Sequence, residues 1–243
     1  YRFTVQWGTQ TSTDDAEGQT ISTSTHIPSR DNILAALPHF TGNITQVPPA
    51  FSAIKINGQR AYKAARKGEE VTLPSRKLYI ADLQLLTDSQ MPPTLNQFIS
   101  EYSHFEVTCQ TGTYVRALAR DLALFLGTFG HCIRIIRTKV GAFEAQNTIL
   151  LDSLEQMSYD SRLTILRPLA FGLDDIPALA ITEAESQDLR RGQGVSFLSL
   201  TNSNRLPQPV PTGPVLAMHG DQLIAICLLH GGVLRPSRVM NHS

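Results

Sequence analysis

Hydrophobic and polar residues alternate over the first seven residues, so that Tyr1 and three further apolar side chains share one face. A repeat of two residues is typical of a β-strand that buries one face. We therefore predict a strand over residues 1–8. The same alternation predicts further strands near residues 78–85, 105–109 and 131–140.

A spacing of three to four residues between apolar positions predicts amphipathic helices elsewhere in the chain. Ser29 can cap a short helix that ends before Gly42. Thr113 can cap a longer helix that ends at Gly127. The stripe of the longer helix that we expect to face the core consists of Val115, Leu118, Leu122 and Phe125.

The last part of the chain has the pattern of a small β-rich unit. Thr182 and Glu185 fit a capping box, which predicts a helix that begins at this point. Three short strands separated by glycine turns are predicted near residues 215–218, 223–228 and 233–240. The Asp-Asp-Ile-Pro sequence at residues 174–177 marks a domain boundary. We therefore predict two domains, residues 1–172 and residues 173–243.

Composition excludes several classes of protein. Apolar residues make up 42% and charged residues 17% of the 243 residues, which is typical of a folded chain with a core. No apolar run is long enough for a membrane span, and we expect no membrane association. The three cysteines are odd in number and far apart, and the seven histidines lack ligand spacing, so neither a disulfide framework nor a metal site is indicated. A cytoplasmic protein fits best.

Equal numbers of basic and acidic residues, 21 of each, give no overall signal for a polyanionic partner, but the basic residues cluster. The first cluster, with aromatic residues among it, comprises Lys55, Arg60, Lys63, Arg66, Lys67, Arg76 and Lys77. The second comprises Arg116, Arg120, Arg134, Arg137 and Lys139. Such clusters suit RNA phosphates, and aromatic rings can stack on unpaired bases. On the charges alone, a solvated surface with ion pairs remains the commoner explanation.

A set of ordered motifs favours the RNA-binding interpretation. They are Gln-Val-Pro-Pro-Ala-Phe-Ser-Ala-Ile-Lys at residues 46–55, Gly-x-Arg-Ala-Tyr-x-x-Ala-Arg-x-Gly at 58–68, Gly-Thr-Tyr-Val-Arg at 112–116 and Arg-Thr-x-x-Gly-x-Phe at 137–143. The opening Tyr-x-Phe-x-Val-x-Trp-Gly and the following Thr-x-Thr-x-Asp-Ala-x-Gly at 11–18 agree with them. In this order and spacing the chain resembles the TruB-type tRNA pseudouridine synthases. The resemblance is dense over residues 1–143 and weaker afterwards.

The resemblance implies an α+β fold, with a mixed, largely antiparallel sheet and flanking helices. It also implies an RNA-binding insertion near residues 50–75 and a small C-terminal β-rich, PUA-like domain that binds RNA. The family isomerises uridine 55 in the T-loop of tRNA to pseudouridine. A member is expected to bind the T-arm of tRNA as a monomer, with no cofactor, no metal and no protein partner.

The resemblance also assigns roles to single residues. Tyr1 would lie against the flipped uracil, and Arg116 would pair with the catalytic aspartate and hold it ionised. Tyr114 and Ile135 would pack on the substrate base. The residues expected to bind the T-arm are Lys55, Tyr62, Lys63, Arg66 and Arg137.

The chain departs from the family pattern at the nucleophile. The family carries its nucleophilic aspartate in a Gly-x-x-Asp-x-x-Ala-x-Gly segment upstream of the strand that begins at Tyr1, and these 243 residues contain no such segment. We expect Asp14 and Asp15 to form a turn outside the site, and Asp121 to serve in a helical ion pair. We therefore expect an N-terminally truncated fold and negligible isomerase activity for the chain as written.

Two alternatives remain open at this point. The first is a non-catalytic RNA-binding protein or tRNA-folding chaperone that uses the same basic surface. The second is a synthase guided to ribosomal RNA by a partner ribonucleoprotein. An aspartate upstream of Tyr1 would distinguish an enzyme from the chaperone.

Overall fold

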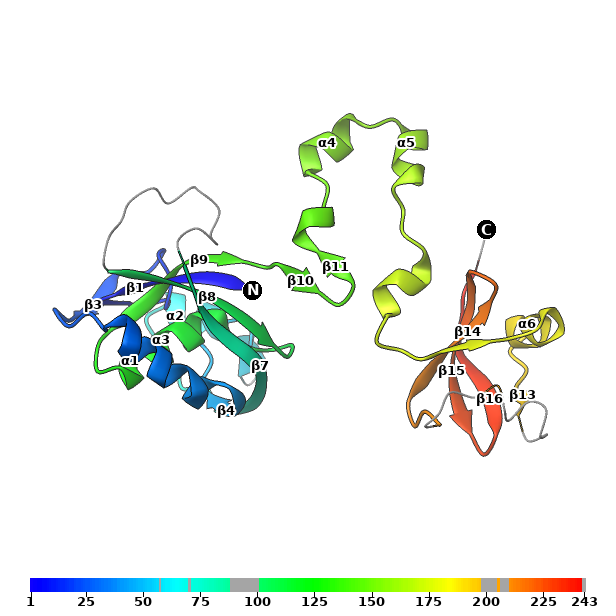
Figure 1. The fold of residues 1–243 in the computed structure, drawn as a ribbon, viewed down its shortest axis with the longest axis horizontal. Coiled ribbons are helices and arrows are strands. Elements are labelled where there is room, and N and C mark those ends of the chain that lie inside the picture. Colours follow the sequence, from blue (N-terminus) through cyan, green and yellow to red (C-terminus); the bar gives the residue numbers. More distant parts are fainter. Residues whose placement is uncertain (57, 70, 88–100, 198–204, 206–209, 242–243) are drawn as a thin grey trace. The chain divides into compact units, whose positions relative to one another are not determined.

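The computed structural model describes residues 1–56, 58–69, 71–87, 101–197, 205 and 210–241. The chain forms two compact units, Tyr1–Thr138 and Lys139–Ser243, which are described separately (Figure 1). The predicted domain division at residues 172 and 173 falls inside the second unit, and the domain assignment stays a prediction. Among the described residues, no helix has the length and hydrophobicity needed to cross a membrane.

The first unit is built on a five-stranded sheet with the order β4-β7-β8-β1-β9, in which all neighbours are antiparallel. Its strands are β1 (Arg2–Trp7), β4 (Gly42–Gln46), β7 (Arg76–Leu86), β8 (Tyr102–Cys109) and β9 (Gly130–Ile136). A small ribbon, β2 (Thr9–Thr11) and β3 (Thr20–Thr23), follows β1. The alternation of residues 1–8 therefore does mark a strand.

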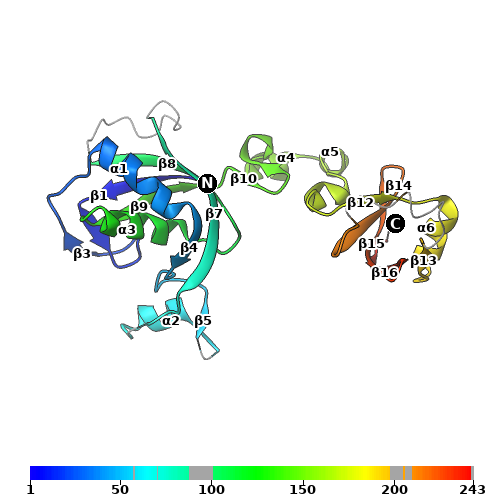
Figure 2. The same cartoon turned by 60° about the horizontal axis from the view of Figure 1, so that its bottom comes forward.

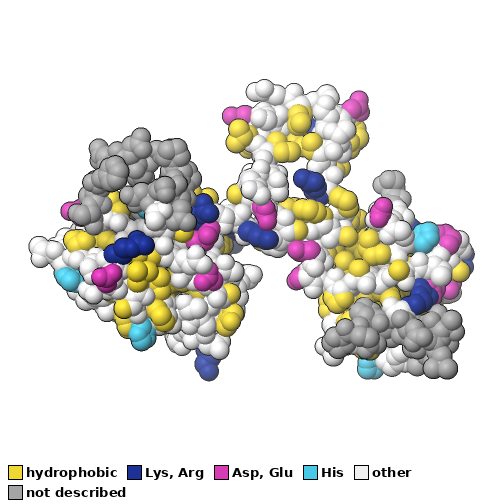
Figure 3. All heavy atoms as spheres, viewed as in Figure 1, with side chains coloured by type: hydrophobic (Ala, Val, Ile, Leu, Met, Phe, Trp, Pro, Cys, Tyr) yellow, Lys and Arg dark blue, Asp and Glu magenta, His cyan; other side chains and the backbone are white. Residues whose placement is uncertain are grey.

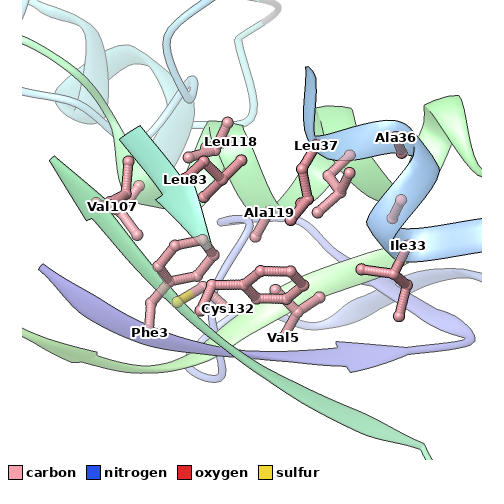
Figure 4. Close-up of a cluster of buried hydrophobic side chains, with 14 of the residues drawn as sticks. Phe3, Val5, Ile33, Ala36, Leu37, Leu83, Val107, Leu118, Ala119 and Cys132 are labelled. Atoms are coloured by element: carbon pink, nitrogen blue, oxygen red, sulfur yellow. The ribbon is translucent and has the colours of Figure 1, made fainter. Parts of the chain in front are cut away.

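Two helical segments cover one face of this sheet. They are α1 (Arg30–Ala36), continued by the 3-10 helix η1 (Leu37–Phe40), and α3 (Val115–Phe125). Ser29 caps α1 as predicted, because its hydroxyl accepts the amide of Asn32. The core lies between these helices and the sheet, as Figure 4 shows for Phe3, Val5, Leu118 and their neighbours.

Close packing fixes α3 on the sheet. The buried rings of Phe3 and Phe105 stack with centroids 5.2 Å apart. A Cβ atom on Gly130 would lie 2.8 Å from the Cβ atom of Ala123, so β9 and α3 approach this closely only because residue 130 is glycine. The prediction that Phe125 is buried is wrong, since the ring is 53% exposed at the last turn of the helix.

An insertion leaves the sheet between β4 and β7. It consists of the hairpin β5 (Lys55–Ile56) and β6 (Gln59–Arg60) and the helix α2 (Ala61–Arg66), and Figure 2 shows it projecting beyond the ends of β4 and β7. Gly58 in the hairpin turn has φ +83°, a conformation that favours glycine. The predicted hairpin and helix are thus present where the insertion was expected, although Asn57 lies outside the described residues.

The second unit begins with irregular structure and short helices. Its elements are β10 (Lys139–Val140), β11 (Phe143–Glu144), η3 (Ala145–Asn147), α4 (Leu151–Gln156), α5 (Tyr159–Thr164) and η4 (Leu169–Leu173). Neither α4 nor α5 buries a residue, and hydrophobic side chains are visible on the surface of both in Figure 3. Arg162 ties the two together by donating to the carbonyls of Leu154 and Glu155 at 3.0 and 2.9 Å.

A second five-stranded sheet, with the order β12-β14-β15-β16-β13, completes this unit. Its elements are β12 (Ala178–Ala180), α6 (Glu183–Arg190), β13 (Val195–Ser196), β14 (Pro214–His219), β15 (Gln222–His230) and β16 (Val233–Val239). The capping box predicted at Thr182 and Glu185 is present at the start of α6. The α+β class and the C-terminal β-rich unit are therefore confirmed; only β12 pairs in parallel with its neighbour among the described strands of the two sheets.

Candidate functional site

The N-terminus of α3 is held by a side chain from a distant strand. Gln46, 1% exposed at the end of β4, accepts the amide of Tyr114 at 2.9 Å and donates to its carbonyl at 3.2 Å. Tyr114 is the N-cap residue of α3, so the prediction that Thr113 caps this helix is wrong. The Thr113 hydroxyl instead bonds the carbonyl of Gln110. The first turn of α3, with Arg116 in it, is thereby fixed to the sheet.

Arg116 lies at the centre of a hydrogen-bonded cluster. Its Nη1 donates to the Asp15 carboxylate at 2.6 Å and to the Thr13 carbonyl at 3.0 Å. Its Nη2 donates to the Phe51 carbonyl at 3.0 Å. The side chains of Arg116 and Asp15 are only 22% and 23% exposed, so solvent screens this pair less than a surface ion pair.

The Asp15 carboxylate uses both of its oxygens. Oδ2 accepts from Arg116, while Oδ1 accepts the hydroxyl of Thr13 and the amide of Glu17. We predicted that this turn lies outside the site. That prediction is wrong, because the Asp15 carboxylate binds Arg116, a predicted site residue. An aspartate with both oxygens engaged is suited to orienting the arginine rather than to attacking a base.

A pocket of about 470 Å³ opens beside this ion pair, within the size range of small-molecule sites. It is lined by Thr13, Asp15, Glu17, Phe51, Ser52, Ala53, Tyr62, Arg66 and Arg116. One wall is the turn at residues 13–17 with α3, and the other is the insertion. The pocket thus combines carboxylates, guanidinium groups and aromatic rings.

The insertion brings Tyr62 and Arg66 to the pocket through local hydrogen bonds. The amides of Ala61 and Tyr62 donate to the carbonyls of Ile54 and Ser52 at 2.7 and 3.0 Å, which anchors the start of α2 on the segment that precedes β5. Tyr62 and Arg66 are one helical turn apart, and the guanidinium carbon lies 5.4 Å from the ring centroid. The two side chains therefore form a cation–π pair in the lining of the pocket.

Lys55 and Lys63, the other predicted RNA-binding residues of the insertion, are exposed and do not line the pocket. Both are on the same insertion as Tyr62 and Arg66. The structure therefore leaves these two lysines free to solvent, as a phosphate contact requires, while their role stays a prediction.

A second group of predicted site residues lies around the end of β9. The Arg137 guanidinium carbon is 5.3 Å from the centroid of the Tyr1 ring. Ile135, 43% exposed, is opposite Phe3 in the pairing of β9 with β1. Tyr1, Tyr114, Ile135 and Arg137 are not among the described residues that line the pocket. Their assignment to the flipped base and to the T-arm stays a prediction.

The sequence of the chain is similar to a known protein family. Residues 1–115 match the model of the TruB family pseudouridylate synthase (N-terminal domain). The chain is 43% identical over 242 residues to the tRNA pseudouridine synthase B of Caulobacter vibrioides, covering 98% of this chain and 75% of that protein. The chain belongs to the TruB family of pseudouridine synthases.

Other TruB relatives are similarly close. The tRNA pseudouridine synthase B of Rhodospirillum rubrum is 40% identical over 242 residues, covering 99% of this chain and 76% of that protein. The TruB chain here therefore spans about three quarters of the length of these relatives. The matches extend past residue 138, so the second unit is also part of the TruB architecture.

The fold of this TruB protein is shared with more distant solved structures. A chain in the crystal structure of a Cbf5-Nop10-Gar1 complex superposes with a TM-score of 0.63 at 16% identity, covering 98% of this chain and 65% of that chain. At this identity the likeness shows the fold alone. The predicted pseudouridine synthase fold is confirmed by it.

Proposed function

We propose that this TruB protein isomerises uridine 55 in the T-loop of tRNA to pseudouridine, and that its first unit binds the T-arm. The observation that carries the proposal is the pocket that the Arg116–Asp15 ion pair lines together with Tyr62 and Arg66. The names of the relatives, tRNA pseudouridine synthase B, agree with this substrate class.

The chemistry of the pocket suits a flipped nucleotide. Extruding a base costs a few kcal/mol of stacking and pairing. Stacking on an aromatic side chain returns about 1–3 kcal/mol per base, and Phe51 and Tyr62 offer rings at the pocket. Arg66 and the exposed Lys63 supply positive charge for the flanking phosphates. No cofactor or metal has a part in this proposal.

The test is genetic and chemical. Disruption of the coding sequence in its host should remove pseudouridine from position 55 of tRNA, as mapped by chemical derivatisation and mass spectrometry. The wild-type gene should restore the modification and an Arg116→Gln gene should not. Unchanged pseudouridine at position 55 after disruption would contradict the proposal.

The isolated chain of 243 residues provides a second test. We expect it to retain tRNA, and the release of tritium from tRNA labelled at carbon 5 of uridine tests whether these 243 residues contain the nucleophile. Rapid tritium release would show that the nucleophile lies within the chain. Failure to retain tRNA would contradict T-arm binding.

The proposal includes a monomer that acts in the cytoplasm. Cys109, Cys132 and Cys227 are free thiols, which suits a reducing compartment. Light scattering after size-exclusion chromatography should give one protein chain per T-arm RNA. Two chains per complex would contradict the monomer.

A further inference from the structure

Two arginines one turn apart on α3 bridge the same two segments of the first unit. Arg116 binds the turn at residues 13–15 and the carbonyl of Phe51. Arg120 repeats this arrangement: its Nη1 donates to the Asp14 carboxylate at 2.9 Å, and its Nη2 donates to the Val47 carbonyl at 2.7 Å. The segment from Val47 to Phe51, which leads from β4 into the insertion, is therefore fixed at both ends.

The Arg120 contacts are largely removed from solvent. The side chain of Arg120 is 15% exposed, that of Asp14 9% and that of Asp121, its other partner, 29%. A guanidinium group holds several acceptors at once because its donors point in fixed, different directions. An ammonium group on a flexible stem does this less well.

The turn that receives Arg120 is itself anchored and conformationally restricted. Asp14 has φ +60°, in the left-handed region that aspartate and asparagine tolerate better than most residues. Its carbonyl accepts the amide of Cys132 at 3.0 Å, which ties the turn to β9. Arg120 thus connects the segment that leads into the insertion to a turn that β9 already holds in place.

We propose that Arg120 is a positioning residue for T-arm recognition. It ties residues 47–51, which lead into the insertion, to the turn at residues 13–15, so that Tyr62 and Arg66 line the same pocket as Asp15 and Arg116. The inference rests on the proposed function for its RNA-binding part, while its structural part stands on the contacts alone. Arg120 is not among the described residues that line the pocket, so the proposed role is one of positioning and not of contact with the substrate.

The experiment measures two properties of each variant. The first is the affinity for a fluorescently labelled T-arm stem-loop RNA. The second is the hydrogen exchange of the amides of Ala61 and Tyr62, which anchor α2. Exchange of the amides of β8, which pairs with β1 and β7 inside the central sheet, reports whether the unit is folded.

Arg120→Gln should weaken RNA binding about tenfold, which corresponds to one lost charge-assisted hydrogen bond. The amides of Ala61 and Tyr62 should exchange about tenfold faster, with the β8 amides still protected. Glu106→Gln serves as the matched control, because it breaks the Arg2–Glu106 pair on the sheet without touching the insertion. This control should retain wild-type affinity and wild-type exchange at Ala61 and Tyr62.

Two milder variants test the positioning role of Arg120 if Arg120→Gln does not fold. Arg120→Lys keeps the positive charge beside Asp14 but cannot hold the same set of acceptors, so we expect a folded protein with weaker RNA binding. Asp14→Asn keeps an acceptor oxygen for Arg120 as well as the bond from Arg120 to Val47, so both arms of the bridge remain and RNA binding should stay within about twofold of wild type. A folded Arg120→Lys variant with wild-type affinity and wild-type exchange would overturn the inference.

RNA affinity and hydrogen exchange together distinguish a failure of the proposed function from a failure of the role of Arg120. If the wild-type protein does not bind the T-arm, the RNA part falls with the proposed function. Faster exchange at Ala61 and Tyr62 in the Arg120 variants would then still support Arg120 as the residue that fixes the insertion. Unchanged exchange in folded Arg120 variants would overturn this role, whatever the RNA result.

Discussion

Replacing Arg116 by glutamine should destabilise the first unit strongly. The change removes two bonds to carbonyl groups and leaves the Asp15 carboxylate without its cation. Breaking a buried ion pair costs about 3–5 kcal/mol, while an exposed pair is worth about 1 kcal/mol or less. Because the two side chains are about one fifth exposed, we expect a loss of about 2–4 kcal/mol in the free energy of unfolding.

Asp15→Asn is the matched partner of this variant. Asparagine can still accept a hydrogen bond from Arg116, and Arg116 keeps both carbonyl partners. We therefore expect a smaller loss, about 1–2 kcal/mol. In the double variant the two losses should not add, because both single changes break the same contact.

Trp7 provides the assay. It is the only tryptophan of the chain, is 2% exposed in the core of the first unit and donates to the hydroxyl of Ser103. Its fluorescence during urea unfolding therefore reports the first unit and not the second. A loss below about 1 kcal/mol for Arg116→Gln would show that the pair behaves as a screened surface pair, and would refute this reasoning.

Two further predictions concern titrating groups elsewhere. Burial raises the pKa of Cys132 and of Cys227 to about 12, so iodoacetamide at pH 8 should label partly exposed Cys109 alone in the folded protein; labelling of all three at equal rates would contradict this. Hydrogen bonds from Arg205 lower the pKa of Glu185 from its ordinary 4.5. The ionised carboxylate therefore stabilises the second unit at pH values above 4.5, and this stabilisation is lost as the pH falls through the lowered pKa. The protection factors of the α6 amides, which compare their exchange with that of an unfolded peptide at the same pH, should therefore fall on acidification in the wild type, and much less so in Glu185→Gln.

Local patterns in the sequence were sufficient to predict much of the fold. The alternation of residues 1–8, the serine before α1 and the capping box before α6 each depend on neighbouring residues, and each prediction is confirmed. The order of the motifs was also sufficient for the family. These features can be predicted from the sequence because each depends on interactions between residues only a few positions apart.

The contacts that build the site could not be predicted in this way. Gln46 reaches Tyr114 across 68 positions, and Asp15 reaches Arg116 across 101. A polar residue at a strand end and an aspartate in a turn both have ordinary local explanations, so the sequence offered no reason to bring them to α3. The error on Thr113 has the same origin, since a distant amide replaces the expected local cap.

Recognition of the T-arm of tRNA by the pocket of the first unit is the step on which the proposed function depends. Its most direct test is the affinity of the protein for a T-arm stem-loop, compared with a stem-loop of scrambled loop sequence, for the wild type and for Arg66→Gln over a range of salt concentrations. We predict preference for the T-arm, and a salt slope reduced by about 1 in the variant. Equal affinity for both RNAs, with an unchanged slope in Arg66→Gln, would contradict this recognition.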